Sequence, residues 1–198
     1  MASTIYYGDK MPIYYVPKTD FKIVTAEEMR PFVNGAGELD MKAVLALAWL
    51  TGARIQEILN LVRKDFLLDE VAKDGMVINR ALKFGKTGYP SFSFSDPFVS
   101  DVLLPYLAQL GGEDRLFSKS KRLYQSRLHK LNEVLHSQDK SKWITFHYLR
   151  HSRITHLAQI LRAFPEELKS WTGHRSSAYE EYFAPRRVDR FKGRLGEA

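Results

Sequence analysis

The stretch that decides the fold and the candidate site runs from Thr145 to Tyr182 and reads TFHYLRHSRITHLAQILRAFPEELKSWTGHRSSAYEEY. It places His147 and Arg150 three residues apart at the start of a helical pattern. A second short amphipathic run ends at Gly173-His174, and the stretch then closes on tyrosines. Guanidinium and imidazole donors combined with a phenol suit a phosphodiester substrate better than any other class of substrate.

Each of these side chains has a chemical role at a phosphate. Because residues at i and i+3 share one helix face, the imidazole of His147 and the guanidinium of Arg150 can converge on one group. Arginine donates two parallel bonds to phosphate oxygens, and such preorganised cations stabilise the charge that develops during phosphoryl transfer. Tyr182 is the expected nucleophile, provided that nearby positive charge favours its phenolate. Tyr179 competes for that role.

Arg54 is expected to complete the cationic set from an earlier part of the chain. The run Thr51-Gly52-Ala53-Arg54 breaks an apolar helix predicted over 40–50 and starts another over 53–62. Arg54 therefore lies at a helix junction loosened by glycine, where its side chain can be directed at a ligand. Glu57, one turn later, is expected to orient a basic side chain rather than to act as an acid or base. The apolar face of this second helix is predicted to consist of Ile55, Ile58, Leu59 and Val62.

Lys86 is expected at the tip of a β-hairpin. After residue 62 the periodicity changes, and strands are predicted at 66–68, 76–82 and 91–95 with a turn at 85–88. This gives a small antiparallel sheet, from whose hairpin tip the ammonium of Lys86 could reach the leaving oxygen and donate a proton. Lys83 is a rival for the same role.

The rest of the chain is predicted to be mainly helical. A capping box at Thr25 and Glu28 opens a helix that should end near Asn34-Gly35, and Asp96-Pro97 opens one that should run to Leu110. A helix is expected over 121–136, and its apolar face should contain Leu123, Leu128, Leu131 and Leu135. Two further helices are expected, the first capped by Thr145 and the second over 165–171. The fold class is therefore mainly α with a small antiparallel β-sheet (α+β).

The composition of the chain limits the kinds of partner and cofactor that it can be expected to bind. The 198 residues allow one domain, and the net charge is +7, of which +5 falls between Ser141 and Ala198 (eleven Lys and Arg against six Asp and Glu). A basic half of the chain indicates a polyanionic partner, most simply nucleic acid, although charge alone can also serve solubility. The absence of cysteine excludes disulfides, thiolate metal sites and a cysteine nucleophile. The sequence also shows no cluster of carboxylates of the kind that holds a metal ion. We therefore expect no cofactor, no metal and no membrane span or export signal, hence a cytoplasmic, nucleoid-associated protein.

These motifs together resemble the tyrosine recombinase (phage integrase) family. They are TGARIQEILNL, the lysine of KTG, HYLRHSRITHLA, and TGH followed by a tyrosine, in the family's order. The resemblance spans roughly residues 25–185, essentially the catalytic domain, and implies a mainly helical domain with a small sheet. It implies a strand transferase whose tyrosine attacks a DNA phosphate to give a 3′-phosphotyrosyl link, without a high-energy cofactor, in tetramers on two duplexes. The implied catalytic residues are Arg54, Lys86, His147, Arg150, His174 and Tyr182.

The sequence departs from the family pattern in two places. The gap from His174 to Tyr182 is one residue shorter than usual, which keeps Tyr179 in competition. The family's separate N-terminal DNA-binding domain is not seen, so we expect either the catalytic domain of a longer integrase or a minimal enzyme. Residues 1–24 are interpreted as an extended arm and 186–198 as a basic tail. Candidate DNA contacts are Arg175, Arg186 and Arg187, although a basic run can also be merely solvated or contact a neighbouring protomer.

Two other functions fit the same residues. One is relaxation of supercoiled DNA by the same cleavage, as in type IB topoisomerases, and the other is a DNA-binding accessory protein that performs no chemistry. The presence of all the expected side chains argues against the second. His151 and His156 have no partner that the sequence can identify, and we interpret both as structural.

Overall fold

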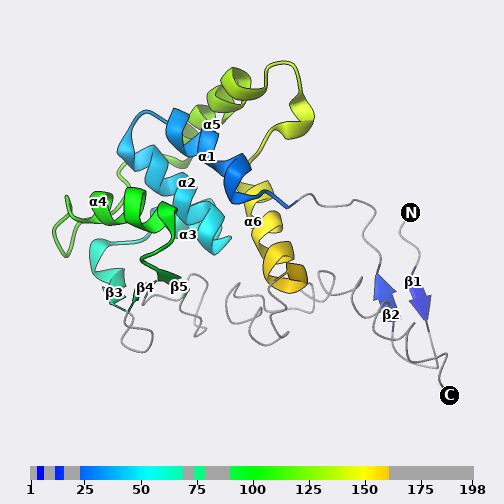
Figure 1. The fold of residues 1–198 in the computed structure, drawn as a ribbon, viewed down its shortest axis with the longest axis horizontal. Helices are drawn as coiled ribbons and strands as arrows, with labels where there is room; N and C mark the ends of the chain where they lie inside the picture. Colours follow the sequence, from blue (N-terminus) through cyan, green and yellow to red (C-terminus); the bar gives the residue numbers. More distant parts are fainter. Residues whose placement is uncertain (1–3, 7–11, 16–22, 69–73, 79–89, 161–198) are drawn as a thin grey trace.

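The computed structural model describes residues 4–6, 12–15, 23–68, 74–78 and 90–160. Within these ranges the chain forms helices around a buried centre with one three-stranded antiparallel sheet at the edge (Figure 1). This confirms the α+β class expected from the sequence. Two short strands in the expected N-terminal arm, β1 (Thr4–Tyr6) and β2 (Pro12–Tyr15), pair with each other in antiparallel fashion. No helix in the described ranges combines the length and the apolar character that crossing a membrane requires.

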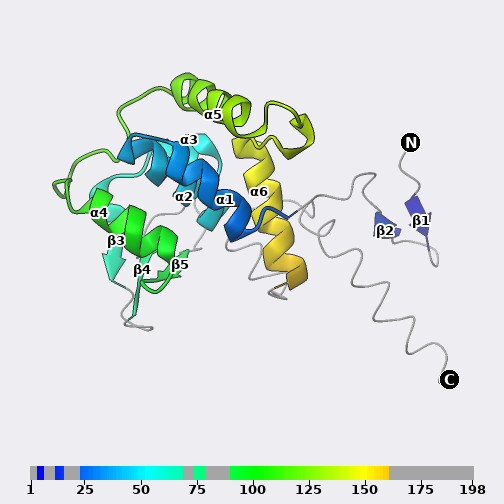
Figure 2. The same ribbon diagram turned by 45° about the horizontal axis from the view of Figure 1, so that its top comes forward.

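Helix α2 (Leu39–Thr51) forms the centre of the fold. Nine of its thirteen residues are buried, as its nearly continuous apolar sequence predicts. It packs against α1 (Ala26–Gly35), which crosses in front of it in the turned view of Figure 2, and against α6 (Phe146–Thr155), which stands to the right of both. Helix α1 begins with the predicted capping box, in which Thr25 and Glu28 each accept a bond from the other's backbone amide. Because α2 contacts α6 directly, residues at the end of α2 and within α6 are brought together.

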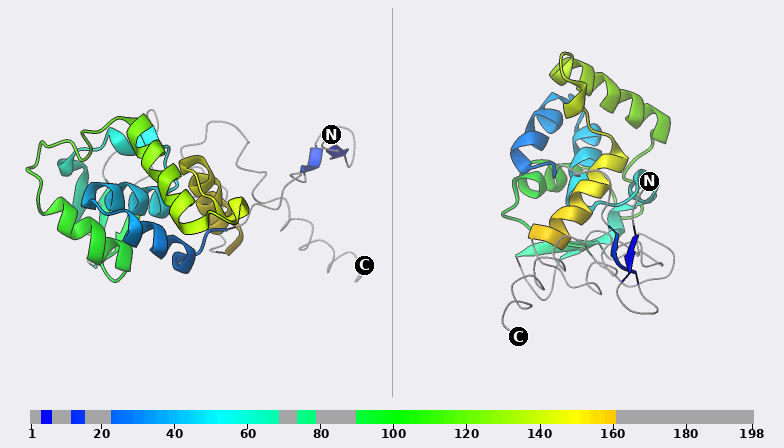
Figure 3. Two further views of the ribbon diagram at one scale, coloured as in Figure 1. Left: turned by 90° about the horizontal axis from the view of Figure 1, so that it is seen from above. Right: turned by 90° about the vertical axis from the view of Figure 1, so that its right-hand side faces the viewer.

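Helix α5 (Lys121–His136) has the predicted bounds, and Leu128, Leu131 and Leu135 of the predicted leucine face contribute to the core or pack against it. Tyr124, Leu128 and Asn132 are buried, whereas Leu123 is 40% exposed, so the expected leucine face was wrong at Leu123. The hydroxyl of Tyr124 donates to Asp40 at the start of α2, at 3.0 Å, and its ring packs edge-on against Phe117. A buried aromatic with a satisfied hydroxyl therefore sets the rotation of the helix. Figure 3 shows α5 lying across one side of the helical layer.

The sheet has the strand order β3-β4-β5, formed by β3 (Phe66–Leu68), β4 (Gly75–Ile78) and β5 (Ser91–Ser93). Leu67 lies opposite Val77, and Met76 opposite Phe92. The strand predicted to reach residue 95 ends at Ser93, because the chain turns there: the hydroxyls of Ser93 and Ser95 hydrogen-bond to each other at 2.9 Å. Residues 79–89, with the predicted hairpin tip, lie outside the described ranges.

Two helices are shorter than predicted. Helix α3 (Ile55–Leu59) ends before Val62, which instead forms a β-bridge with Arg115, while Ile55, Ile58 and Leu59 are buried as expected. After Asp96, a π-helical turn (Val99–Leu103) leads into α4 (Leu104–Leu107), so the helix ends before Leu110. At the end of α3, pairing with a distant residue replaced a helical continuation that the local pattern allowed.

Candidate active site

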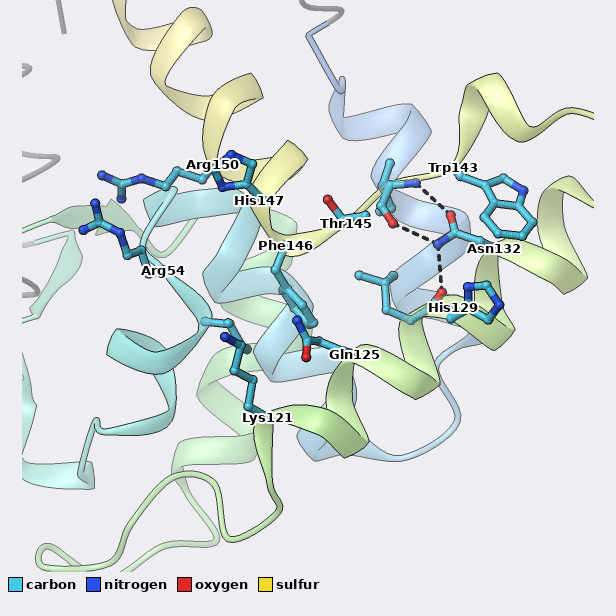
Figure 4. A pocket seen from close by; sticks show the side chains of 13 residues that line it. Arg54, Lys121, Gln125, His129, Asn132, Trp143, Thr145, Phe146, His147 and Arg150 are labelled. Carbon is cyan, nitrogen blue, oxygen red and sulfur yellow. Dashed lines mark hydrogen bonds between the residues drawn. The ribbon is translucent and has the colours of Figure 1, made fainter. Parts of the chain in front are cut away.

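A pocket of about 370 Å³ opens between the start of α3, α5 and the start of α6. Arg54, His147 and Arg150 all line it, so the structure brings these three predicted site residues together. Figure 4 shows the two guanidinium groups extending in the same direction, with the ring of His147 beside them and Lys121 and Gln125 farther along the pocket. The remaining lining residues are Ile55, Leu128, His129, Asn132, Trp143, Ile144, Thr145 and Phe146.

Arg54 is held by its own helix. It is the N-cap residue of α3, with extended backbone dihedrals. Glu57 accepts a bond from the Arg54 backbone amide at 2.8 Å and from its guanidinium at 3.0 Å, as expected for a carboxylate that orients a basic side chain. The Arg54 side chain is 46% exposed. It is therefore restrained at its base and accessible to an anion at its tip.

Arg150 is buried, and its position depends on the end of α2. Its guanidinium donates to the carbonyl of Gly52 at 2.8 Å, across 98 positions of sequence. Gly52 ends α2 in the left-handed conformation (φ 63°), and this backbone turn directs its carbonyl away from the helix ladder. The same turn leads directly into Arg54. One glycine junction therefore positions both arginines of the pocket.

The start of α6 is fixed by two sets of hydrogen bonds. The hydroxyl of Thr145 accepts from the Tyr148 amide at 3.0 Å and caps the helix, as the sequence predicts. The buried side-chain amide of Asn132 on α5 bonds both the N–H and the carbonyl of Ile144, each at 2.8 Å (dashed lines in Figure 4). These contacts place the first turn of α6, and hence His147, relative to α5.

His147 has a partner that the sequence interpretation missed. Its Nε2 lies 2.7 Å from Nε2 of His151, and the two rings meet nearly edge to face. His147 is exposed, whereas His151 is half-buried. Burial, followed by the charges of His147 and Arg150, lowers the pKa of His151. The i,i+4 spacing of the two histidines was the signal that could have found this contact.

The same helical run carries a second contact of a basic side chain with a histidine, outside the pocket. The guanidinium of Arg153 lies 3.1 Å from Nδ1 of His156 and over the ring of Trp49. Burial lowers the pKa of Arg153 to about 10, and burial together with Arg153 lowers the pKa of His156. These residues anchor α6 to α2, which agrees with the structural interpretation of His156.

The other predicted site residues lie outside the described ranges. They are Lys86, His174 and Tyr182, the rivals Lys83 and Tyr179, and the candidate DNA contacts Arg175, Arg186 and Arg187. Within the described part of the chain, no group of three or more His, Cys, Asp or Glu side chains is arranged to hold a metal ion.

Comparison with solved structures identifies the fold. No protein-family model and no curated protein sequence matches the chain. The chain is similar to the XerH site-specific recombinase bound to difH substrate in a pre-cleavage complex (TM-score 0.64, 19% identity, 90% of this chain and 56% of that chain). It is also similar to the XerA recombinase (TM-score 0.54, 20% identity, 82% of this chain and 59% of that chain).

A third similar structure is the Tn1549 transposon integrase in complex with transposon right end DNA (TM-score 0.58, 16% identity, 88% of this chain and 67% of that chain). The chain thus spans about half to two thirds of the length of the structures it matches. The order of the elements, the small sheet and these likenesses agree: the chain has the fold of the tyrosine recombinase catalytic domain.

Proposed function

We propose that the chain is the catalytic domain of a site-specific DNA recombinase or integrase that cleaves and rejoins DNA through a 3′-phosphotyrosyl intermediate. The observation that carries the proposal is the convergence of Arg54, His147 and Arg150 on one pocket within a recombinase fold. Two arginines can neutralise the non-bridging oxygens of a phosphodiester from two directions, which is the main requirement for phosphoryl transfer.

The proposed reaction has two transfers that balance. The phenolate of Tyr182 attacks the phosphorus and forms the P–O bond to the enzyme, while the bond to the 5′-oxygen breaks and that oxygen takes a proton from Lys86. Arg54 and Arg150 stabilise the transition-state charge, and His147 and His174 donate to the phosphate oxygens. A 5′-hydroxyl then attacks the phosphotyrosine and returns its proton to Lys86, which restores the phosphodiester and releases Tyr182 as the phenolate. The energy of the original bond is retained, so no cofactor is needed.

Double-stranded DNA is the proposed partner, and a homotetramer on two duplexes is the proposed working assembly. Two of the similar structures are named as DNA complexes, XerH with difH and the Tn1549 integrase with transposon end DNA. Residues 25–185 would form the catalytic domain, and Arg175, Arg186 and Arg187 would contact the DNA backbone. A role in integrating a mobile or viral element, close to the chromosome of its host, follows from the same proposal.

Covalent capture tests the reaction without knowledge of the target site. The protein is incubated with a pool of nicked duplexes that carry a randomised segment, in which the fragment between the nick and the cleavage point diffuses away and prevents rejoining. DNA that survives denaturation on the protein is then sequenced. The proposal predicts enrichment of a defined sequence and an adduct that Tyr182→Phe abolishes.

The matched variant Tyr179→Phe separates the two candidate nucleophiles. An adduct that persists in Tyr182→Phe and vanishes in Tyr179→Phe would move the nucleophile to Tyr179 while retaining the reaction. If the wild-type protein binds duplex DNA but no adduct forms in the pool, the chain is a DNA-binding accessory protein and the enzymatic proposal is wrong. Relaxation of supercoiled plasmid with no enriched sequence would indicate topoisomerase activity instead.

A further inference from the structure

The chain enters the helical body through residues 23–25, which we call the entry strap. In Figures 1 and 2 the strap, in blue, passes beside α6 on its way to α1. Val24, in its middle, is 5% exposed. The Val24 amide donates to the hydroxyl of Ser152 on α6 at 2.7 Å, and the Val24 carbonyl accepts from Nε1 of Trp49 on α2 at 3.1 Å. Side chains from two helices therefore hold both backbone polar groups of one residue.

The two hydrogen bonds of Val24 depend on each other. Val24 precedes Thr25, the N-cap residue of α1, and the hydrogen-bond ladder of that helix begins only at the Thr25 carbonyl. Buried backbone groups need partners, and here Ser152 and Trp49 supply them. Because the amide and the carbonyl of one residue are only a few covalent bonds apart, the strap cannot leave one partner without straining its bond to the other. The loss of either side-chain partner should therefore release both.

The strap contacts α6 on the side away from the pocket. Ser152 is 2% exposed and follows Arg150 by two residues, which is about 200° around an α-helix, whereas Arg150 lines the pocket. Trp49 also touches α6, because its ring lies below the guanidinium of Arg153, whose central carbon is 5.8 Å from the ring centroid. The strap and Trp49 thus support the back of the helix whose front carries Arg150 and His147.

We propose that the entry strap sets the position of α6, so that Ser152 and Trp49 are positioning residues for Arg150 and His147. The consequence for DNA cleavage rests on the proposed function, whereas the strap itself does not. A helix moves as a rigid element, so a shift at its back displaces the side chains on its front. A displacement of about 1 Å in a catalytic group can lower the rate by about 10²-fold. A released strap should therefore slow the reaction without removing any group that touches the phosphate.

Amide hydrogen exchange on the free protein tests whether the two bonds act together. Trp49→Phe removes the indole donor and keeps a ring in its place, while the bond from the Val24 amide to Ser152 remains chemically possible. The Val24 amide should exchange at least about tenfold faster in Trp49→Phe as well as in Ser152→Ala. Thr155→Val is the matched control, because Thr155 is buried on the same helix and its hydroxyl has no hydrogen-bond partner among the described residues. It should leave the exchange of Val24 unchanged.

Nitrogen NMR of the Arg150 guanidinium reports on the pocket side of α6 in the same samples. Its signals should shift in both Ser152→Ala and Trp49→Phe, because the bond from Arg150 to the Gly52 carbonyl changes when α6 moves. They should stay in place in Thr155→Val.

Cleavage kinetics test the positioning role. At saturating DNA, Ser152→Ala and Trp49→Phe should each lower the single-turnover rate of adduct formation by about tenfold, while DNA affinity is unchanged. The double variant should be about as slow as either single variant, because a strap that is already released cannot be released again. Two contacts that support α6 independently would instead multiply to about a hundredfold loss. Thr155→Val should cleave at the wild-type rate.

The outcomes separate this proposal from the proposed function. Wild-type protection of the Val24 amide in Trp49→Phe overturns the strap. Faster exchange with unshifted Arg150 signals, or with cleavage at the wild-type rate, overturns the positioning role, and so do rate losses that multiply. If the wild type forms no adduct at all, the recombinase proposal fails, while the exchange of Val24 and the signals of Arg150 still decide whether the strap positions α6.

Discussion

Arg54 illustrates how one residue of the site is controlled locally. Glu57 holds both its backbone amide and its guanidinium, three residues away on the same short helix. Because the Arg54 side chain is half-exposed, this ion pair adds little to stability, about 0–1 kcal/mol. Its importance lies in orientation, since a guanidinium that is already aimed at the pocket loses less freedom when a phosphate binds.

Glu57→Gln is therefore expected to separate function from stability. The amide oxygen can still accept from the Arg54 backbone, but the charge that attracts the guanidinium is lost. We expect adduct formation to slow by about tenfold, with a change of less than about 1 kcal/mol in the free energy of unfolding. Glu113→Gln, which removes the exposed partner of Lys64, is the control and should leave cleavage unaltered. A loss of stability without a loss of rate would contradict the orienting role.

At the scale of elements, the junction between α2 and α3 joins the two halves of the pocket. Gly52 has φ 63°, and a Cβ placed on it would meet Cβ of Arg153 at 3.0 Å and its Cγ at 3.2 Å. Gly37 has a similar backbone, φ 69°, with no atom within 4 Å of the added carbon. The two glycines thus differ in their surroundings rather than in their conformation.

Gly52→Ala and Gly37→Ala form a matched pair. Each should cost about 1–2 kcal/mol of unfolding free energy for a left-handed alanine. Gly52→Ala should cost at least about 1 kcal/mol more because α6 must shift. It should also slow cleavage, because the carbonyl that holds Arg150 moves. Urea unfolding of the two variants measures the difference, and equal costs would show that α6 accommodates the extra carbon without strain.

Asn132 links α5 to the chain entering α6. Asn132→Ala leaves the N–H and carbonyl of Ile144 without their side-chain partner in a buried site, so we expect a loss of about 2–4 kcal/mol of unfolding free energy. Gln125→Ala, on the exposed side of the same helix, should change stability by less than about 0.5 kcal/mol. A small effect in Asn132→Ala would mean that the cap at Thr145 alone fixes the start of α6. Chemical denaturation of both variants provides the measurement.

For the whole molecule, charge governs the encounter with DNA. A net charge of +7 favours any polyanion, but only cations that touch phosphates release counterions on binding. We expect the DNA affinity of the wild type to fall steeply with salt. Arg54→Gln should reduce the slope of log K against log salt by about one unit, whereas Lys64→Gln, whose ammonium is paired with Glu113, should leave it unchanged. Equal slopes for all three proteins would place Arg54 away from the phosphates.

The local features of the fold were readable from the sequence. Capping at Thr25 and Thr145, the bounds of α5 and the break at Gly52 all depend on residues within a few positions of each other, and each is found in the structure. The pairing of Glu57 with Arg54 has the same local character. The end of α3 and the exposure of Leu123 on α5 were mispredicted, because contacts with distant segments decided them, and α4 also ends earlier than predicted.

What the sequence by itself determined is a set of cationic and imidazole side chains on short helices, since helix caps, glycine turns and i,i+3 spacing act over a single turn. Tertiary structure alone decided that Arg150 would be held by the carbonyl of Gly52, 98 positions away, and that Asn132 would fix the approach to His147. These long-range bonds form only when α2, α5 and α6 pack together. Their packing places Arg54, His147 and Arg150 around the same pocket.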